Sequence, residues 1–135
     1  MTEVKKLKFE YSGSKPLFQQ VADQITEGIL NGSYKELEQI PSTTEISKGY
    51  QINPATVLKG MNLLVDQELI EKKRGLGMFV LAGAQDKVKS IRKEEFLTKE
   101  IAHLVVEAKK LGITAEQLKK LIERIEDLIS KEELD

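Results

Sequence analysis

The stretch from Ile40 to Val80 constrains the fold of this chain most, because it predicts two short helices, a tight turn and a strand pair in succession. Ser42 and Glu45 stand in capping-box spacing, in which each side chain satisfies a backbone N–H of the other residue. They predict a helix over residues 43–48. Gly49 is placed to end it, because glycine tolerates the left-handed conformation found after many helices.

A second helix is predicted to begin at Asn53 and Pro54. Asparagine is a good N-cap, and proline fits the first helical position because that position needs no N–H donor. Apolar residues then recur at helical spacing and are expected to face the core: Val57, Met61, Leu64 and Val65. Thr56, Lys59 and Gly60 lie off that stripe. In helix-turn-helix proteins the beginning of the second helix enters the major groove of DNA.

Two short strands, over residues 69–71 and 78–81, are predicted to flank a basic, glycine-rich tip at 72–77. Each motif taken alone is more often an ordinary turn or a solvated hairpin end. In this order, within one short window, they support each other and predict a winged helix-turn-helix that binds DNA. The candidate DNA-binding residues are Ser42, Thr43, Thr44, Asn53, Ala55, Thr56, Lys59, Lys72, Lys73, Arg74 and Gly75.

Five segments together resemble the N-terminal domain of the GntR family of bacterial transcription regulators. They are residues 16–20 (PLFQQ), 40–42 (IPS), 53–57 (NPATV), 69–70 (LI) and 74–80 (RGLGMFV). The resemblance runs from about Ser14 to Ala82 and implies one helix before the motif, here residues 17–31. Many members carry arginine where this chain has Thr44, Pro54 and Leu58. The Asn-Pro start and short tail are similar to the YtrA-type subfamily, which implies a repressor of a neighbouring transporter operon.

The net charge of the chain does not by itself indicate DNA binding. The formal net charge is −1, and residues 1–81 hold ten Lys/Arg and ten Asp/Glu, a difference of zero. Attraction to DNA must therefore come from the placement of Lys48, Lys59, Lys72, Lys73 and Arg74 on one face. A winged fold that docks protein rather than DNA stays open as an alternative.

The rest of the chain predicts an N-terminal arm (1–13), a winged module (14–82), a hinge (83–86) and a helical tail (87–135). Leu7, Phe9 and Tyr11 alternate with charged residues in a strand-like period. In the tail, Leu97, Ile101, Leu104, Ala108 and Leu111 form one apolar stripe, and Gly112 is placed to end their helix. Thr114 and Gln117 form a second capping box, which predicts a helix to about Lys131.

The stripe on that last helix needs a partner surface, and the hinge favours a second copy of the chain. The fold class is thus mainly α with a small β wing: a winged helix-turn-helix followed by a two-helix C-terminal dimerisation tail. A homodimer would also suit a palindromic operator. The candidate dimerisation residues are Leu104, Leu111, Leu118, Leu121, Ile122, Ile125 and Leu128. Packing of the stripe on the chain's own winged module, or a small apolar effector between the tail helices, remains an alternative.

Other classes of protein find little support. The chain has no cysteine, no hydrophobic signal core and no apolar run near the ~18 residues needed to span a membrane, so a cytoplasmic protein is expected. His103 has Glu100 and Glu107 at helical spacing, and an ordinary surface ion-pair face is favoured over a metal site. No nucleophile elbow or phosphate loop is present. We expect no enzymatic activity and no cofactor.

Overall fold

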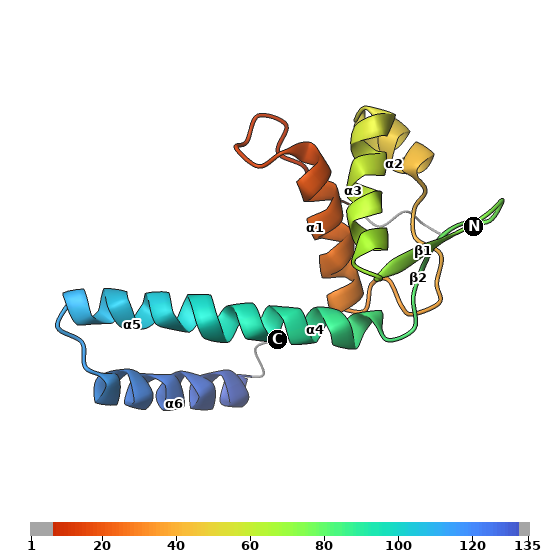
Figure 1. Ribbon diagram of the computed structural model, residues 1–135. Helices are drawn as coiled ribbons and strands as arrows, with labels where there is room; N and C mark the ends of the chain where they lie inside the picture. The colour runs from red at the N-terminus through yellow and green to blue at the C-terminus, as the bar shows by residue number, and fades with distance from the viewer. Residues whose placement is uncertain (1–6, 133–135) are drawn as a thin grey trace. The chain divides into compact units, whose positions relative to one another are not determined.

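The computed structural model describes residues 7–132 and divides the chain into two compact units, the first ending at Ile91 and the second beginning at Arg92. The first unit holds α1 (Leu17–Leu30), α2 (Thr43–Tyr50), α3 (Pro54–Asp66), β1 (Ile70–Lys73), β2 (Gly77–Val80) and most of α4 (Ala84–Glu95) (Figure 1). The second holds η1 (Phe96–Glu100), α5 (Ile101–Lys110) and α6 (Ala115–Glu132). The predicted architecture, mainly helical with a small two-stranded wing, is confirmed.

The core of the first unit forms where α1 crosses α3. Val21, Ile25 and Ile29 of α1 meet Val57, Met61 and Leu64 of α3, and all six side chains are fully buried. Gly60 lies at this crossing, where a Cβ would be 2.6 Å from the Phe18 carbonyl oxygen. The placement of Gly60 off the core stripe was therefore wrong: glycine is needed there because the two helix backbones approach closely.

The first helix of the motif, α2, runs two residues beyond its predicted end. Gly49 continues the helix, and Gln51 takes the left-handed conformation instead, with φ 53°. The reason is the packing of the core and not the local sequence pattern. Ile52 is buried in the core, and its backbone carbonyl accepts a hydrogen bond from Ser47 Oγ at 2.7 Å. Burial of Ile52 places the left-handed turn residue at Gln51, two positions later than the predicted Gly49.

The wing is a two-stranded antiparallel sheet in which Ile70 pairs with Val80 and Lys73 with Gly77. The segment before α2 adds a short third edge, because Gln39 forms an isolated bridge with Phe79. Alternate residues Met78 and Val80 are buried against the helices, and Glu71 and Phe79 face the other side. The wing is therefore anchored in the same core as α3.

The described part of the predicted arm is irregular rather than a strand. Leu7 is buried and its N–H donates to Tyr50 Oη at 2.8 Å, while the Phe9 ring meets the Tyr50 ring edge-on at 5.2 Å. Tyr11 is exposed, and its hydroxyl donates to the Tyr50 carbonyl at 2.6 Å. Residues 1–6 of the predicted arm lie outside the described residues.

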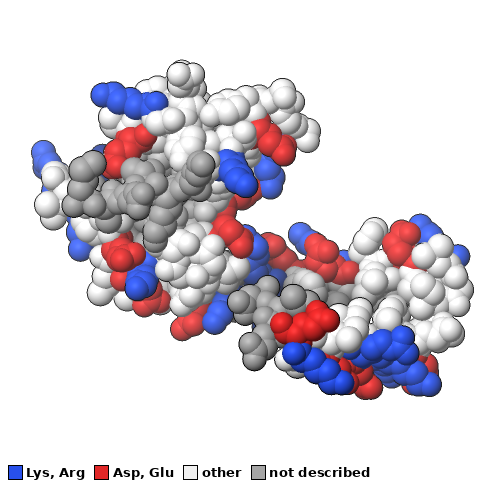
Figure 2. All heavy atoms as spheres, turned by 180° about the vertical axis from the view of Figure 1, so that it is seen from behind, with Lys and Arg blue, Asp and Glu red and all other residues white. Residues whose placement is uncertain are grey.

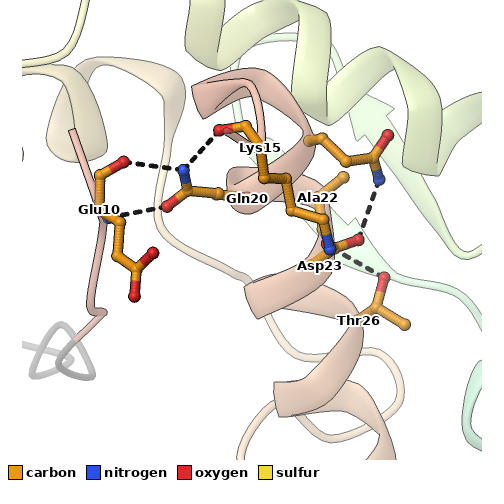
Figure 3. A network of polar contacts seen from close by, with 7 residues as sticks. Glu10, Lys15, Gln20, Ala22, Asp23 and Thr26 are labelled. Atoms are coloured by element: carbon orange, nitrogen blue, oxygen red, sulfur yellow. Dashed lines mark hydrogen bonds and ion pairs between the residues drawn. The ribbon is translucent and has the colours of Figure 1, made fainter. Parts of the chain in front are cut away.

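Gln20 attaches this arm to α1, as Figure 3 shows. Its Oε1 accepts from Glu10 N at 2.8 Å, and its Nε2 donates to the carbonyls of Glu10 and Lys15 at 2.9 and 2.8 Å. Beside it, Lys15 Nζ lies 2.6 Å from an Asp23 carboxylate oxygen. One buried amide thus satisfies three backbone groups of a segment without secondary structure.

The predicted hinge is mostly helical. Gly83 has a positive φ of 83°, but Ala84 already begins α4, and Lys87 N donates to Gly83 O at 3.1 Å. Ala84 and Val88 are buried in the core of the first unit. Residues 84–86 are therefore the first turn of a helix that this unit holds in place, not a loop between two parts.

The second unit is a helical hairpin in which residues 111–114 join α5 to α6 (Figure 1). Gly112 ends the first helix with φ 74°, and the predicted capping box opens the second: Gln117 N donates to Thr114 Oγ1 at 3.1 Å, and Thr114 N to Gln117 Oε1 at 2.8 Å. The π-helical segment η1 was not predicted. No described helix is long and apolar enough to cross a membrane.

Candidate nucleic-acid interface

The beginning of α2 has the capping geometry that the sequence predicts. Glu45 N donates to Ser42 Oγ at 3.0 Å, and Ser42 N donates to Glu45 Oε1 at 3.1 Å. The cap therefore occupies the Ser42 hydroxyl as an acceptor. Thr43 and Thr44 follow in the first helical turn, half-buried and exposed respectively. This helix start can receive a phosphate, because backbone N–H groups and the helix dipole favour an anion there.

The start of α3 is the exposed end of the second helix in the motif. Asn53 caps it, with Oδ1 accepting from Ala55 N at 2.8 Å, and Pro54 occupies the first helical position. Both Asn53 and Ala55 are exposed, whereas Thr56 is half-buried. The cap uses the Asn53 carbonyl oxygen and leaves its amide nitrogen to donate outward.

Lys59 also lies on the exposed face of α3, but its ammonium group contacts an aromatic ring of α1. Lys59 Nζ sits 4.0 Å from the centroid of the Phe18 ring on α1, a cation–π contact. Phe18 was not among the predicted site residues, since nothing near Lys59 in the sequence identifies a ring from another helix. The ring directs the lysine toward the α1 side of the recognition helix.

The wing tip carries the remaining predicted cations. Lys72, Lys73 and Arg74 are exposed, and Lys73 Nζ lies 4.7 Å from the Phe79 ring centroid and 3.8 Å from a Glu71 carboxylate oxygen. Among residues 7–132, Lys72 and Arg74 form no ion pair. Two cations at the end of the hairpin are therefore available to phosphate groups.

Backbone geometry fixes the shape of that tip. Gly75 and Gly77 have φ values of 77° and 116°, which favour glycine, so Gly75 acts through the turn and not through a side chain. Gln39 Nε2 donates to the Leu76 carbonyl at 2.8 Å and steadies the turn from outside the hairpin. Gln39 was missed by the sequence analysis, because its partner is 37 residues away.

Charges on the surface are mixed. In the face that Figure 2 shows, lysine and arginine are interspersed with aspartate and glutamate, and no broad field of one sign appears. This agrees with the formal net charge of −1. Any electrostatic attraction to DNA is thus local, as the equal charge count over residues 1–81 led us to expect.

The remaining predicted site residues lie in the second unit. Leu104, Leu111, Leu121, Ile122, Ile125 and Leu128 are all exposed, and Leu118 is half-buried. His103 is exposed on α5. Residues 7–132 contain no group of three or more His, Cys, Asp or Glu side chains arranged to hold a metal ion.

A helix-turn-helix followed directly by a basic hairpin, both anchored in one core, defines a winged helix-turn-helix protein. The gntR family of bacterial regulatory proteins matches residues 17–80. A solved GntR-family structure from Bacteroides thetaiotaomicron is 35% identical, with a TM-score of 0.70 over 82% of this chain and 96% of that one. The chain belongs to the GntR family and is a DNA-binding transcription regulator of the helix-turn-helix type.

Two curated relatives show how far the similarity extends. The HTH-type transcriptional repressor YtrA of Bacillus subtilis is 28% identical over 83% of this chain and 85% of its own length. The mannosyl-D-glycerate transport/metabolism system repressor MngR of Escherichia coli is 32% identical over 68 residues, and the chain spans only 28% of that protein. The likeness to MngR thus concerns about half of this chain, whereas the likeness to YtrA includes most of the tail.

Proposed function

We propose that this protein is a cytoplasmic homodimeric repressor that binds a palindromic operator through α3 and the wing. The observation that carries the DNA-docking proposal is that the exposed start of α3 and the free cations of the wing tip stand on neighbouring elements of one core. Ser42, Thr43 and Thr44 would approach the DNA backbone, Asn53, Ala55, Thr56 and Lys59 the major groove, and Lys72, Lys73, Arg74 and Gly75 the flanking phosphates or minor groove.

The repressor role rests on the similarity to YtrA, whose name describes a transcriptional repressor. A repressor of this size would act by covering a promoter sequence that RNA polymerase needs. Control of a neighbouring transporter operon, which the family resemblance implies, belongs to the same proposal.

The homodimer rests on the apolar face of α6. Leu121, Ile122, Ile125, Leu128 and Ile129 are each about half exposed, between 44% and 55%. Covering the exposed half of such a side chain contributes about 1 kcal/mol, so five from each copy contribute on the order of 10 kcal/mol gross. Association itself costs about 4–15 kcal/mol. The face of α6 alone would be marginal, and Leu104 of α5 and Leu111 of the connection that follows α5 are therefore included in the proposed interface.

An effector site is the weaker candidate for the same region. An open hollow of about 360 Å³ is lined by Ile113, Gln117, Lys120, Leu121 and Arg124. It shares Leu121 with the apolar face, so a second copy of the chain would compete with a small molecule for this surface. We therefore favour the dimer.

The DNA-docking proposal is tested by measuring affinity for the region upstream of the gene across a range of salt concentrations. Arg74→Ala should weaken binding and reduce the slope of log K against log salt by about one unit, because one phosphate contact is lost. Lys59→Ala should weaken binding as well. Lys35→Ala is the matched control, since Lys35 is an exposed lysine of the same unit outside α2, α3 and the wing.

Unchanged affinity and slope in both variants would show that the docking surface is elsewhere. If the parent protein binds this DNA no better than random DNA of equal length, a winged fold that docks protein becomes the better account.

A further inference from the structure

The recognition helix α3 exposes an apolar side chain at the centre of its outward face. Leu58 is 43% exposed, although its neighbours Val57 and Met61 are fully buried. Ala55 and Asn62, three residues before and four residues after Leu58, are also exposed. Residues at these spacings are neighbours on one side of a helix. Leu58 and Ala55 thus form a small apolar patch on the surface of α3 that points away from the core.

Two of the polar groups near this patch are engaged within the protein. The Asn53 carbonyl oxygen accepts from Ala55 N in the helix cap, and the Lys59 ammonium lies 4.0 Å from the Phe18 ring toward α1. The first two turns of α3 carry no arginine, glutamine or glutamate. The Asn53 amide nitrogen, Thr56 and Asn62 remain available as hydrogen-bond donors. Leu58, at the centre of this face, can contribute to base recognition only through apolar contact.

The chemistry of the major groove suggests what such a patch can recognise. Each base edge there offers hydrogen-bond donors or acceptors, and thymine adds a C5-methyl group, which is apolar. A leucine placed against the polar edge of guanine, cytosine or adenine would desolvate that edge without replacing its hydrogen bonds to water. Against a thymine methyl group, both partners lose only contact with water.

We propose that Leu58, together with Ala55, reads thymine C5-methyl groups, so that each half-site carries thymine at the positions these two side chains meet. This inference rests on the proposed docking of α3 in the major groove, and it goes further by assigning a specificity-determining residue and the group it recognises. Leu58 would favour thymine by contact and reject the other bases by leaving their edges unsatisfied.

The test uses duplexes that the full chain selects from a randomised pool. Each thymine in a selected duplex is replaced in turn by deoxyuridine, which pairs identically but lacks the methyl group. The parent should lose about fourfold in affinity for each methyl that it contacts. Leu58→Ala should bind the thymine duplex more weakly and should show no further loss with deoxyuridine at the Leu58 position.

Two variants control this comparison. Leu58→Met keeps an apolar side chain of similar volume and helix propensity, and it should retain the sensitivity to deoxyuridine. Leu37→Ala removes another exposed leucine of the same unit, outside α3, and should behave as the parent does. Leu58 is exposed, so we expect all variants to melt within a few degrees of the parent.

The outcomes separate this inference from the docking proposal beneath it. Selective binding with no loss at any deoxyuridine, or with the same loss in the parent and in Leu58→Ala, overturns methyl reading and leaves DNA docking intact. If the pool yields no duplex that is bound better than random sequence, the docking proposal fails and methyl reading fails with it.

Discussion

Gly60 and Gly49 illustrate what a residue in a sequence reveals about its role. Gly49 was predicted to lie just past the end of one helix, and Gly60 to lie inside the next helix but off its core stripe. In the structure, a Cβ added at Gly49 would meet no atom within 4 Å beyond its own helix backbone and chain neighbours, whereas one added at Gly60 would meet α1. The close approach of α3 to α1 at Gly60 depends on residues about forty positions away in the sequence, and no local sequence pattern predicts it.

The two glycines give a matched prediction. Gly60→Ala places a Cβ 2.6 Å from the Phe18 carbonyl oxygen and 3.0 Å from the Val21 Cβ, so overpacking should destabilise the protein by about 1–3 kcal/mol. Gly49→Ala should stabilise it by about 0.4–1 kcal/mol, because alanine restricts the unfolded chain and fits the helix. Thermal or urea unfolding measures both. A neutral Gly60→Ala would mean that α1 and α3 can move apart without cost.

At the scale of elements, the three capped helix starts were predictable, whereas the start of α4 and the end of α2 were not. The caps at Ser42, Asn53 and Thr114 were all confirmed, because a cap is made by residues two or three positions apart. The end of α2 depends on burial of Ile52, which is a property of the whole unit. The wing strands were predicted to within a few residues, because their turn is also set by neighbouring residues. The role of Gln39 was not predicted, because it bonds to a residue far away in the sequence.

The hydrogen bonds by which Gln20 attaches the N-terminal arm to α1 can be tested by substitution. Gln20→Met keeps the volume of the side chain but removes the partners of three backbone groups, which should destabilise the protein by about 1–3 kcal/mol. Hydrogen exchange at Glu10 should also become faster. Gln24→Met is the control, because Gln24 accepts one exposed bond, from Lys8 N, and should cost less than about 0.5 kcal/mol. Equal effects of the two substitutions would contradict the role assigned to Gln20.

For the whole molecule, the winged module could be recognised from sequence because its motifs follow each other in one window. The tail could be predicted as two amphipathic helices, and their hairpin agrees with that prediction. The partner of the tail's apolar face could not be predicted. The exposed stripe centred on Leu121 and Ile125 indicates that some surface covers it, but it does not identify that surface. Assembly therefore remains our proposal.

Leu121→Glu tests that proposal. Leu121 is 48% exposed in the single chain, and a carboxylate there would be buried without a partner in the dimer, at a cost of several kcal/mol. The variant should sediment as a monomer while the winged unit keeps its unfolding transition. Glu123→Lys is the control, because Glu123 lies on the exposed polar side of α6 and should leave the dimer intact. Outright unfolding of Leu121→Glu would indicate instead that the apolar face packs on the chain's own winged module.

The most direct test of the account measures how many chains bind a duplex, by sedimentation, on an inverted repeat and on one isolated half-site. We expect the parent to bind the inverted repeat as two chains and far more tightly than the half-site. Leu121→Glu should bind both duplexes weakly and with similar affinity, because each half-site is then read alone. A parent protein that binds the inverted repeat as one chain, with no advantage over the half-site, would contradict a homodimeric regulator.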